Sequence, residues 1–573
     1  MKKIVITILI LFTYNLVLAD SHFLDKNFKQ LGLHTDNTVN EISGSFVKGS
    51  HVKLFIPTFP YLAISHAING AMIRPADNDK GYVYDVAVSH TSIDDKIWEF
   101  KLRKGVTFQD GTPFNADAVL LNMEYFKKKP LPFARLELYD YTEKIDDYTI
   151  RFHLKEPYGM FFNATIYIQF YSKKYLEKFG YNGKETAPNL AEAGKYGLGP
   201  YILTEGYIEG DRRSKIAVLK ANPNYWGENK PKVETITIYT DLDMDKAVDM
   251  ISNSESKLDI TPILFSNSTD TILSKYAKLT ISETTNSYAM HFNMLNGNKA
   301  MLDDRIRYVL NHSIDQEYLL NLSMLGEGVA SPTMVSPNFY KVDKAIESIQ
   351  DELVKDNKID SIENLKNMVI TYQKENNLNI NEPLKLVFML PKSLLYIVKD
   401  LKFLFKQVHI DLELMIFSGD NDVYSNLLTT YQNKNKISWD ISLFGMYDWF
   451  KHPWSTFFVY QPFNAWSTIP PNKKLSELTD KITKINIESD EYIPSVAALI
   501  SYVYKNNLIG FLPNPNNLYA VNKEVYYRAG SASFIYLRDI EVTPYHWSVR
   551  GKKPYPIERE QPIKVDRNNN NDN

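Results

Sequence analysis

The chain has 573 residues, of which 44% are hydrophobic and 23% charged, so it is long enough for two or three domains of an ordinary globular protein. Its net charge is −3, and no block rich in lysine or arginine stands out, which argues against nucleic acid as a partner. Cysteine is absent, which excludes disulfides, thiolate metal sites and a lipid-carrying cysteine after a leader.

The first 19 residues have the pattern of a secretory signal peptide. Lys2 and Lys3 supply the positive charge, an apolar stretch follows, and Val17-Leu18-Ala19 fits a cleavage site. Cleavage after Ala19 removes two of the 65 basic residues and none of the 68 acidic ones, so the net charge becomes −5. The alternative is a retained membrane anchor, although the apolar stretch is shorter than the roughly 20 residues that span a bilayer. The periplasm is therefore the expected location.

The first half of the chain predicts an alternation of strands and helices. A strand is expected over residues 52–56 and a helix over 60–74. Residues 98–102 alternate large apolar with charged side chains, and the same alternation resumes at 106–108, so we expect a hairpin there. An Asp-Gly turn follows, and the next helix is expected over 114–126. Further strands are expected over 148–155, 216–219, 233–239 and 288–294.

The second half contains one clear βαβ unit. Residues 385–390 and 411–417 are predicted as strands, and the helix between them has one apolar face. Strands joined by a helical crossover are parallel, and residues 439–444 are expected as a third strand of the same sheet. Residues 508–512 and 519–521 are expected as strands that return the chain to its first domain.

Residues 98–119 carry the most specific motif of the chain, WEFKLRKGVTFQDGTPFNADAV. This run resembles the signature of the bacterial family 5 extracellular solute-binding proteins, the peptide- and nickel-binding receptors of ABC importers. It departs from that signature only where Ala118 is inserted near its end. Residues 197–201, 222–227 and 303–315 resemble further blocks of the family in the same order, and the resemblance extends over roughly residues 50–545.

The resemblance implies an α/β fold of two lobes joined by a hinge, that of a type II periplasmic binding protein with an extra domain in the first lobe. Such receptors close over a ligand and present it to the permease and ATPase subunits of an importer in the inner membrane. We expect a monomer that binds without catalysis and needs no cofactor. The expected boundaries are 1–19 for the signal peptide, 20–65, 200–287 and 515–550 for the first lobe, 66–199 for the extra domain, 288–514 for the second lobe and 551–573 for a C-terminal tail.

Patterns of metal or catalytic chemistry are incomplete in this sequence. Asp241, Asp243 and Asp245 imitate the start of a calcium loop. The position that needs glycine holds Lys246, so a turn before a helix is expected instead. Gly183-Lys184 lacks the first glycine of a phosphate loop, and no Gly-x-Ser-x-Gly or His-Glu-x-x-His is present. A secreted hydrolase is thus the remote alternative, and an adhesive role would need repeats that the sequence lacks.

The loop after the 439–444 strand is the expected ligand site, because ligands of open α/β sheets bind beyond the carboxyl ends of the strands. In peptide-binding members of the family, an aspartate in this loop receives the α-amine of the peptide, and Asp448 has a similar setting with one extra residue before Pro453. In nickel-binding members, histidine and aromatic residues near this loop hold a metal chelate. The candidate site residues are Tyr447, Asp448, Trp449, Phe450, His452 and Trp454.

Asp448 and His452 indicate different ligands. Short peptides, anchored by Asp448, are the first choice, and a nickel or other metal chelate held by His452 and Trp454 is the alternative, followed by haem or an oligosaccharide. The aromatic residues would bury the apolar parts of the ligand, unless they only pack the lobe. His291 lies in a predicted strand, and we expect it to be a satisfied histidine of the core or the hinge.

Overall fold

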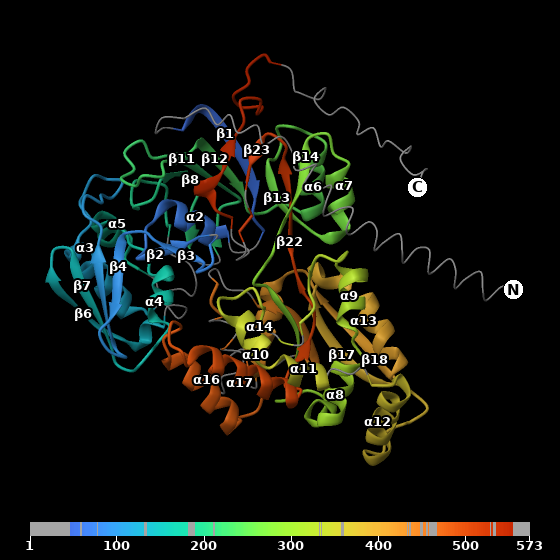
Figure 1. The fold of residues 1–573 in the computed structure, drawn as a ribbon. Coiled ribbons are helices and arrows are strands. Elements are labelled where there is room, and N and C mark those ends of the chain that lie inside the picture. The colour runs from blue at the N-terminus through green and yellow to red at the C-terminus, as the bar shows by residue number, and fades with distance from the viewer. Residues whose placement is uncertain are drawn as a thin grey trace, which may run out of the picture. The chain divides into compact units, whose positions relative to one another are not determined.

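The structure is a computed structural model of residues 1–573 (Figure 1). It describes residues 46–553 except 58–59, 77, 131–134, 182–189, 210–211, 332, 334, 357–359, 432–433, 435–436, 447–450, 454–456, 458–466, 528 and 531–534. The chain divides into two units, residues 1–45 and 46–573, and every described element belongs to the second unit. The predicted signal peptide and the chain beyond residue 553 therefore lie outside the described residues.

A seven-stranded mixed sheet forms the first lobe. Its central strand β1 (Val47–Phe55) is parallel to its neighbours β12 (Val233–Tyr239) and β13 (Ile260–Ile263), and the remaining strand pairs are antiparallel. The strand expected over residues 52–56 is confirmed, although β1 begins earlier, at Val47, and ends at Phe55. The outer strands are β8 (Tyr201–Glu205), β11 (Ile216–Ala221), β14 (Ala277–Ser282) and β22 (Asn517–Asn522), and the helices are α2 (Pro60–Ile68), α6 (Met244–Ser252) and α7 (Ser268–Ile272).

The extra domain is built on an antiparallel four-stranded sheet, which lies at the left of Figure 1 in blue and cyan. Helix α3 (Ala116–Lys128) packs beside β6 and begins at Asn115, whose side chain accepts a hydrogen bond from Ala118 N at 3.2 Å. The strands are β4 (Ala87–Ser92), β5 (Ile97–Leu102), β7 (Thr149–Leu154) and β6 (Tyr139–Asp146), with the hairpin β2 (Ile73–Pro75) and β3 (Tyr82–Tyr84) and the helices α4 (Phe161–Ala164) and α5 (Lys173–Phe179) beside them.

The hairpin predicted over residues 98–108 is wrong. β5 pairs with β4 and β7, and residues 106–114 instead close a loop on themselves. In that loop Phe108 N donates to Thr112 O at 2.8 Å, and Phe114 N donates to Val106 O at 2.9 Å. Val106 and Phe108 are buried all the same, so their alternation reflected burial and not strand pairing.

The helix predicted over residues 60–74 is also too long, because α2 ends at Ile68. Gly70 forms an isolated bridge with Phe170, and a Cβ atom at Gly70 would lie 3.0 Å from Val86 Cγ1. Such a close approach favours glycine over any larger residue. The chain therefore leaves the helix and enters β2.

A five-stranded sheet with the order β18-β17-β19-β15-β20 forms the second lobe. β17 (Leu384–Pro391) is parallel to both β18 (Ile410–Phe417) and β19 (Ile441–Met446), which confirms the predicted βαβ unit and its third strand. β20 (Gly510–Phe511) pairs with β15 (Ser287–Phe292), so of the two strands expected to return to the first domain only β22 does so.

The helices of the second lobe are, in chain order, α8 (Asp304–His312), α9 (Gln316–Ser323), α10 (Val342–Ser348), α11 (Gln350–Asp356), α12 (Ile362–Glu375), α13 (Leu395–Gln407), α14 (Asp420–Tyr431), α16 (Lys473–Lys484) and α17 (Tyr492–Lys505). Three short strand pairs complete the fold: β9 (Ile208–Glu209) with β10 (Arg212–Arg213), β16 (Gly328–Val329) with β21 (Asn514–Pro515), and β23 (Val525–Tyr526) with β24 (Glu541–Val542). None of the helices in the described part of the chain combines the length and the apolarity that crossing a bilayer requires. The residue boundaries expected for the lobes stay a prediction.

Candidate functional site

The parallel strands of both sheets end at edges of the kind where open α/β proteins bind ligands. In the first lobe this edge follows Phe55 of β1 and Tyr239 of β12, and in the second lobe it follows Pro391 of β17 and Met446 of β19. The loop with the candidate residues begins directly after β19. Tyr447, Asp448, Trp449, Phe450 and Trp454 themselves lie outside the described residues.

His452 is the one candidate residue that the structure describes, and its imidazole is completely buried. Its ring meets the ring of Tyr340 edge-on, with 5.4 Å between the centroids. Burial lowers the pKa of His452 to about 3, so the ring is neutral at pH 7. The backbone of Lys80, in the turn between β2 and β3, acts to raise the pKa of His452, but burial has the larger effect.

Two aromatic residues that the sequence analysis missed connect the two lobes. Phe265 begins a single 3-10 turn, η4 (Phe265–Asn267), shortly after β13, and Tyr396 lies in the first turn of α13, shortly after β17. Their ring centroids are 5.5 Å apart. Burial raises the pKa of the Tyr396 hydroxyl well above its ordinary value, and the neighbouring Tyr288 of β15 adds to this effect. An aromatic residue soon after a parallel strand is the signal that would have found both.

The two lobes are joined by segments that hydrogen-bond to each other through short polar side chains. One segment runs from β14 to β15, and the other runs from β20 to β22. Asn286 Nδ2 donates to Asn517 Oδ1 at 3.2 Å, and Asn517 Nδ2 donates to Thr284 Oγ1 at 3.4 Å. Asn338 Nδ2 of the second lobe donates to Thr284 O at 2.8 Å. Adjacent segments of this kind form the hinge of a two-lobed protein.

His291 of β15 is fully buried, as predicted, but it is not a satisfied histidine. Its ring stacks on Phe444 with 3.8 Å between the centroids, and neither ring nitrogen has a hydrogen-bond partner among the described residues. Burial lowers the pKa of His291 to about 3. Within the described part of the chain, no group of three or more His, Cys, Asp or Glu residues is placed to hold a metal ion. Asp243, from the calcium-like run, caps α6 by accepting a hydrogen bond from Lys246 N at 3.2 Å, as the expected turn before a helix requires.

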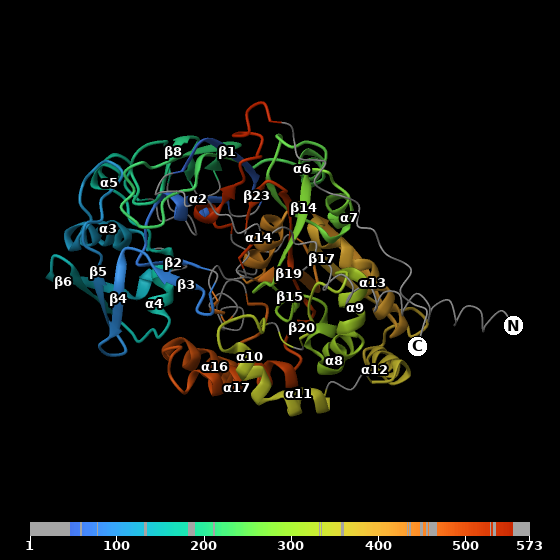
Figure 2. The ribbon, with the colours of Figure 1, turned by 45° about the horizontal axis from the view of Figure 1, so that its top comes forward.

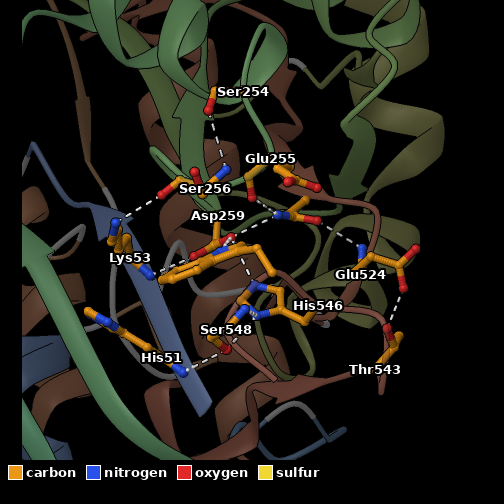
Figure 3. A network of polar contacts seen from close by, with 12 residues as sticks. His51, Lys53, Ser254, Glu255, Ser256, Asp259, Glu524, Thr543, His546 and Ser548 are labelled. Carbon is orange, nitrogen blue, oxygen red and sulfur yellow. Dashed lines mark hydrogen bonds and ion pairs between the residues drawn. The ribbon is translucent and has the colours of Figure 1, made fainter. Parts of the chain in front are cut away.

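A buried carboxylate ties the last described residues to the first lobe (Figure 3). Asp259 immediately precedes β13 and is 0% exposed. The ammonium group of Lys53 lies 4.6 Å from the ring centroid of Trp547, which belongs to the same cluster. The segment after Pro544 therefore belongs to the first lobe. The donors to Asp259 are Lys53 N at 2.8 Å, Asn522 Nδ2 at 2.8 Å, His546 Nε2 at 3.0 Å and Trp547 Nε1 at 3.0 Å.

Comparison with known proteins identifies a family model and several curated relatives. The family model described as bacterial extracellular solute-binding proteins, family 5 Middle, matches residues 81–383. The glutathione-binding protein GsiB of Escherichia coli (strain K12) is 29% identical over 272 residues, which make up 45% of this chain and 49% of that protein. The protein of the same name from Shigella flexneri serotype 5b (strain 8401) is 27% identical over 259 residues, 44% of this chain and 47% of that protein. The chain thus spans about half the length of the curated relatives it matches.

Comparison with solved structures shows the fold. A putative peptide binding protein, AppA, from Clostridium difficile has a TM-score of 0.67 at 15% identity, covering 86% of this chain and 100% of that one. NikA from Staphylococcus aureus, in complex with Ni(L-His)2, has a TM-score of 0.66 at 15% identity with the same coverage. The murein tripeptide binding protein MppA of Escherichia coli has a TM-score of 0.67 at 15% identity, covering 87% of this chain and 99% of that one. These structures confirm the predicted two-lobed fold. Because the family model matches more than half of the chain, this protein belongs to the bacterial extracellular solute-binding proteins of family 5.

Proposed function

We propose that this protein captures short peptides in the periplasm and delivers them to the permease of an ABC importer in the inner membrane. The observation that carries the proposal is the similarity to GsiB of Escherichia coli, which is named for binding glutathione, a tripeptide. MppA, which has the same fold, is likewise named for a tripeptide. Family membership supports a role in binding, and we infer that the bound peptide is released uncut.

Capture works by closing the two lobes about the hinge at Thr284, Asn286 and Asn517. Closing brings together the carboxyl edges of the two sheets. The rings of Phe265 and Tyr396 lie there, and their centroids are 5.5 Å apart in this structure. A ligand held between these edges is shielded from water, and aromatic side chains cover its apolar parts. The closed form is the one that the permease recognises.

We assign Asp448 as the anchor for the ammonium group of the peptide. A carboxylate is needed there because a buried charge without a partner costs several kcal/mol. In the sequence, Asp448 comes two residues after Met446, where β19 ends at the carboxyl edge of the second sheet. Its neighbours Tyr447, Trp449 and Phe450 supply the apolar contacts in this assignment.

Calorimetry on two aspartate variants tests the assignment. Asp448→Ala should weaken the binding of glutathione or of a tripeptide library by about 2–4 kcal/mol, the range for breaking one half of a buried charged pair. Asp480→Ala, which removes an exposed carboxylate of α16, is the matched control and should leave binding unchanged. Equal binding by Asp448→Ala and the parent would show that this loop is only scaffold.

The same measurements distinguish a peptide receptor from a metal-chelate receptor. We expect the parent to bind peptides and to ignore a nickel–histidine chelate and haem. If the parent instead binds the chelate, loses it in His452→Ala and retains no peptide, the protein is a metal-chelate receptor. If the repurified protein cleaves peptides over many turnovers, it is a hydrolase and not a receptor.

A further inference from the structure

The extra domain reaches the second lobe at Gly159, in the loop before α4. Gly159 N donates to Thr483 O at 2.9 Å, and Thr483 lies in the last turn of α16. The last carbonyl groups of a helix have no partner within the helix, so this one is satisfied by a residue from another domain. Figures 1 and 2 both show α4 near α16, from two directions.

This contact leaves no room for a side chain at Gly159. A Cβ atom there would lie 2.2 Å from the carbonyl carbon and oxygen of Ile485 and 2.7 Å from Asn486 N. These are backbone atoms, which cannot rotate away as the end of a side chain would. The flanking residues Tyr158 and Met160 are buried in the extra domain, at 2% and 1% exposed, so the loop itself is held in place.

A second contact lies at the turn between β2 and β3. A Cβ atom at Gly81 would lie 2.5 Å from Lys451 N, so this turn sits directly on the backbone of the second lobe. The next residue, His452, is completely buried. Tyr340 N donates to Lys451 O at 2.6 Å, which fixes the receiving segment within its own lobe.

The two contacts are connected on both sides. In the second lobe, Lys341 Nζ donates to Ile487 O at 3.0 Å and pairs with Glu488 Oε2 at 3.1 Å. This joins the segment next to Lys451 to the residues that follow α16. In the extra domain, the rings of Tyr82 and Phe162 are 5.0 Å apart and connect the two touching loops.

We propose that these two contacts form a latch through which the extra domain holds the two lobes closed, with Gly159 and Gly81 as its positioning residues. The proposal rests on the hinge closure proposed above. The latch contacts protein and not ligand, so it sets the fraction of molecules in the closed form. Weakening it lowers the affinity for every ligand by the same factor, because apparent affinity scales with the population that is competent to bind.

Spin labels on the cysteine-free chain measure the latch directly. Lys174→Cys on α5 and Lys474→Cys on α16 place the labels on exposed positions of the extra domain and the second lobe. In pulsed electron paramagnetic resonance, the parent should show a population with a short distance, without ligand and more so with glutathione. Gly159→Ala should lower the ratio of short to long distances about tenfold, which corresponds to about 1.4 kcal/mol. The control Gly419→Ala should not, because a Cβ atom there meets no heavy atom within 4 Å.

Calorimetry adds the second readout. Gly159→Ala should lower the affinities for glutathione and for an unrelated tripeptide by the same factor. Unchanged distances in Gly159→Ala refute the latch, as does a parent without a short-distance population in any of these conditions. If Gly159→Ala does not fold, as judged by circular dichroism, Gly81→Ala applies the same test to the second contact. The two proposals can also be separated. If Gly159→Ala loses the short-distance population but the unsubstituted protein binds none of the peptides, the latch is supported and the function as a peptide receptor is refuted.

Discussion

Replacing Asp259 by asparagine keeps the size of the side chain but removes an acceptor from a cluster of four donors, of which those of Asn522 and His546 are buried. Asparagine offers one acceptor oxygen and introduces two N–H donors, so about two of the four donors lose their partner. Each unsatisfied buried donor costs about 1–3 kcal/mol, and we therefore expect Asp259→Asn to lower the unfolding free energy of the first lobe by about 2–5 kcal/mol.

Hydrogen exchange followed by mass spectrometry is the suitable assay, because a chain of several domains does not unfold in one two-state step. Peptides from β1 and β22 should exchange about a hundredfold faster for a loss of about 2.8 kcal/mol. Asp270→Asn on α7 changes an exposed carboxylate of the same lobe and should stay within about 0.5 kcal/mol of the parent. Unchanged exchange in β1 and β22 of Asp259→Asn would refute the reasoning.

A truncation after Thr543 completes this experiment. It removes His546 and Trp547, two of the four donors, and leaves Asp259 with Lys53 N and Asn522 Nδ2. Because both changes break the same cluster, the double variant should lose less stability than the sum of the single ones. Strict additivity would mean that the C-terminal segment docks independently of the carboxylate.

Three further predictions concern other parts of the molecule. Intact-mass measurement of the exported protein should find a chain that begins at Asp20, and a full-length chain embedded in the membrane would contradict the signal peptide. The pKa of His291 is lowered from 6.5 to about 3, so the unfolded state binds the extra proton and stability should fall as pH drops from about 6.5 towards 3. In His291→Phe the unfolding free energy should decrease less steeply as the pH drops, which denaturant titrations at several pH values measure. An unchanged pH dependence would show that His291 is not its cause. Tyr396→Leu should weaken glutathione binding about three- to tenfold in calorimetry, because an aromatic pair contributes about 0.5–1.5 kcal/mol; unaltered affinity would separate Tyr396 from ligand capture.

Sequence patterns predicted the second lobe better than the extra domain. The strands β17 and β18 are close in sequence and joined by one helix, so local periodicity and the handedness of crossovers were sufficient to pair them. β5 has the same clear alternation, but its neighbours β4 and β7 were not identifiable from it. Partner choice depends on contacts between distant segments, and the alternation of Val106 and Phe108 offered a false local partner.

The sequence assigns the candidate site to one loop, and this assignment stays a prediction because five of its six residues lie outside the described part of the chain. The loop after β19 follows from the resemblance and from the rule for strand ends. Phe265 and Tyr396 carry only the weaker signal of an aromatic residue soon after a parallel strand, and Gly159 carries none, because its role comes from a residue on another lobe. A glycine in an irregular loop looks like any turn residue until the backbone of Ile485 is seen to occupy the space beside it.

The attachment of the C-terminal segment has a consequence for the order in which the chain folds. His51 N on β1 donates to Ser548 Oγ at 3.0 Å, a contact between residues 497 positions apart. The sheet of the extra domain uses residues 87–154 and that of the second lobe uses residues 287–511, so each can form once its own segment has been made. The first sheet has to wait for β22 and for residues 543–550, about 25–100 s after β1 at the usual rate of synthesis. During that time β13 and β14 lack β22, the strand that lies between them in the sheet, and their unpaired edges are a hazard for aggregation. The first strand to be made therefore belongs to the last lobe to fold.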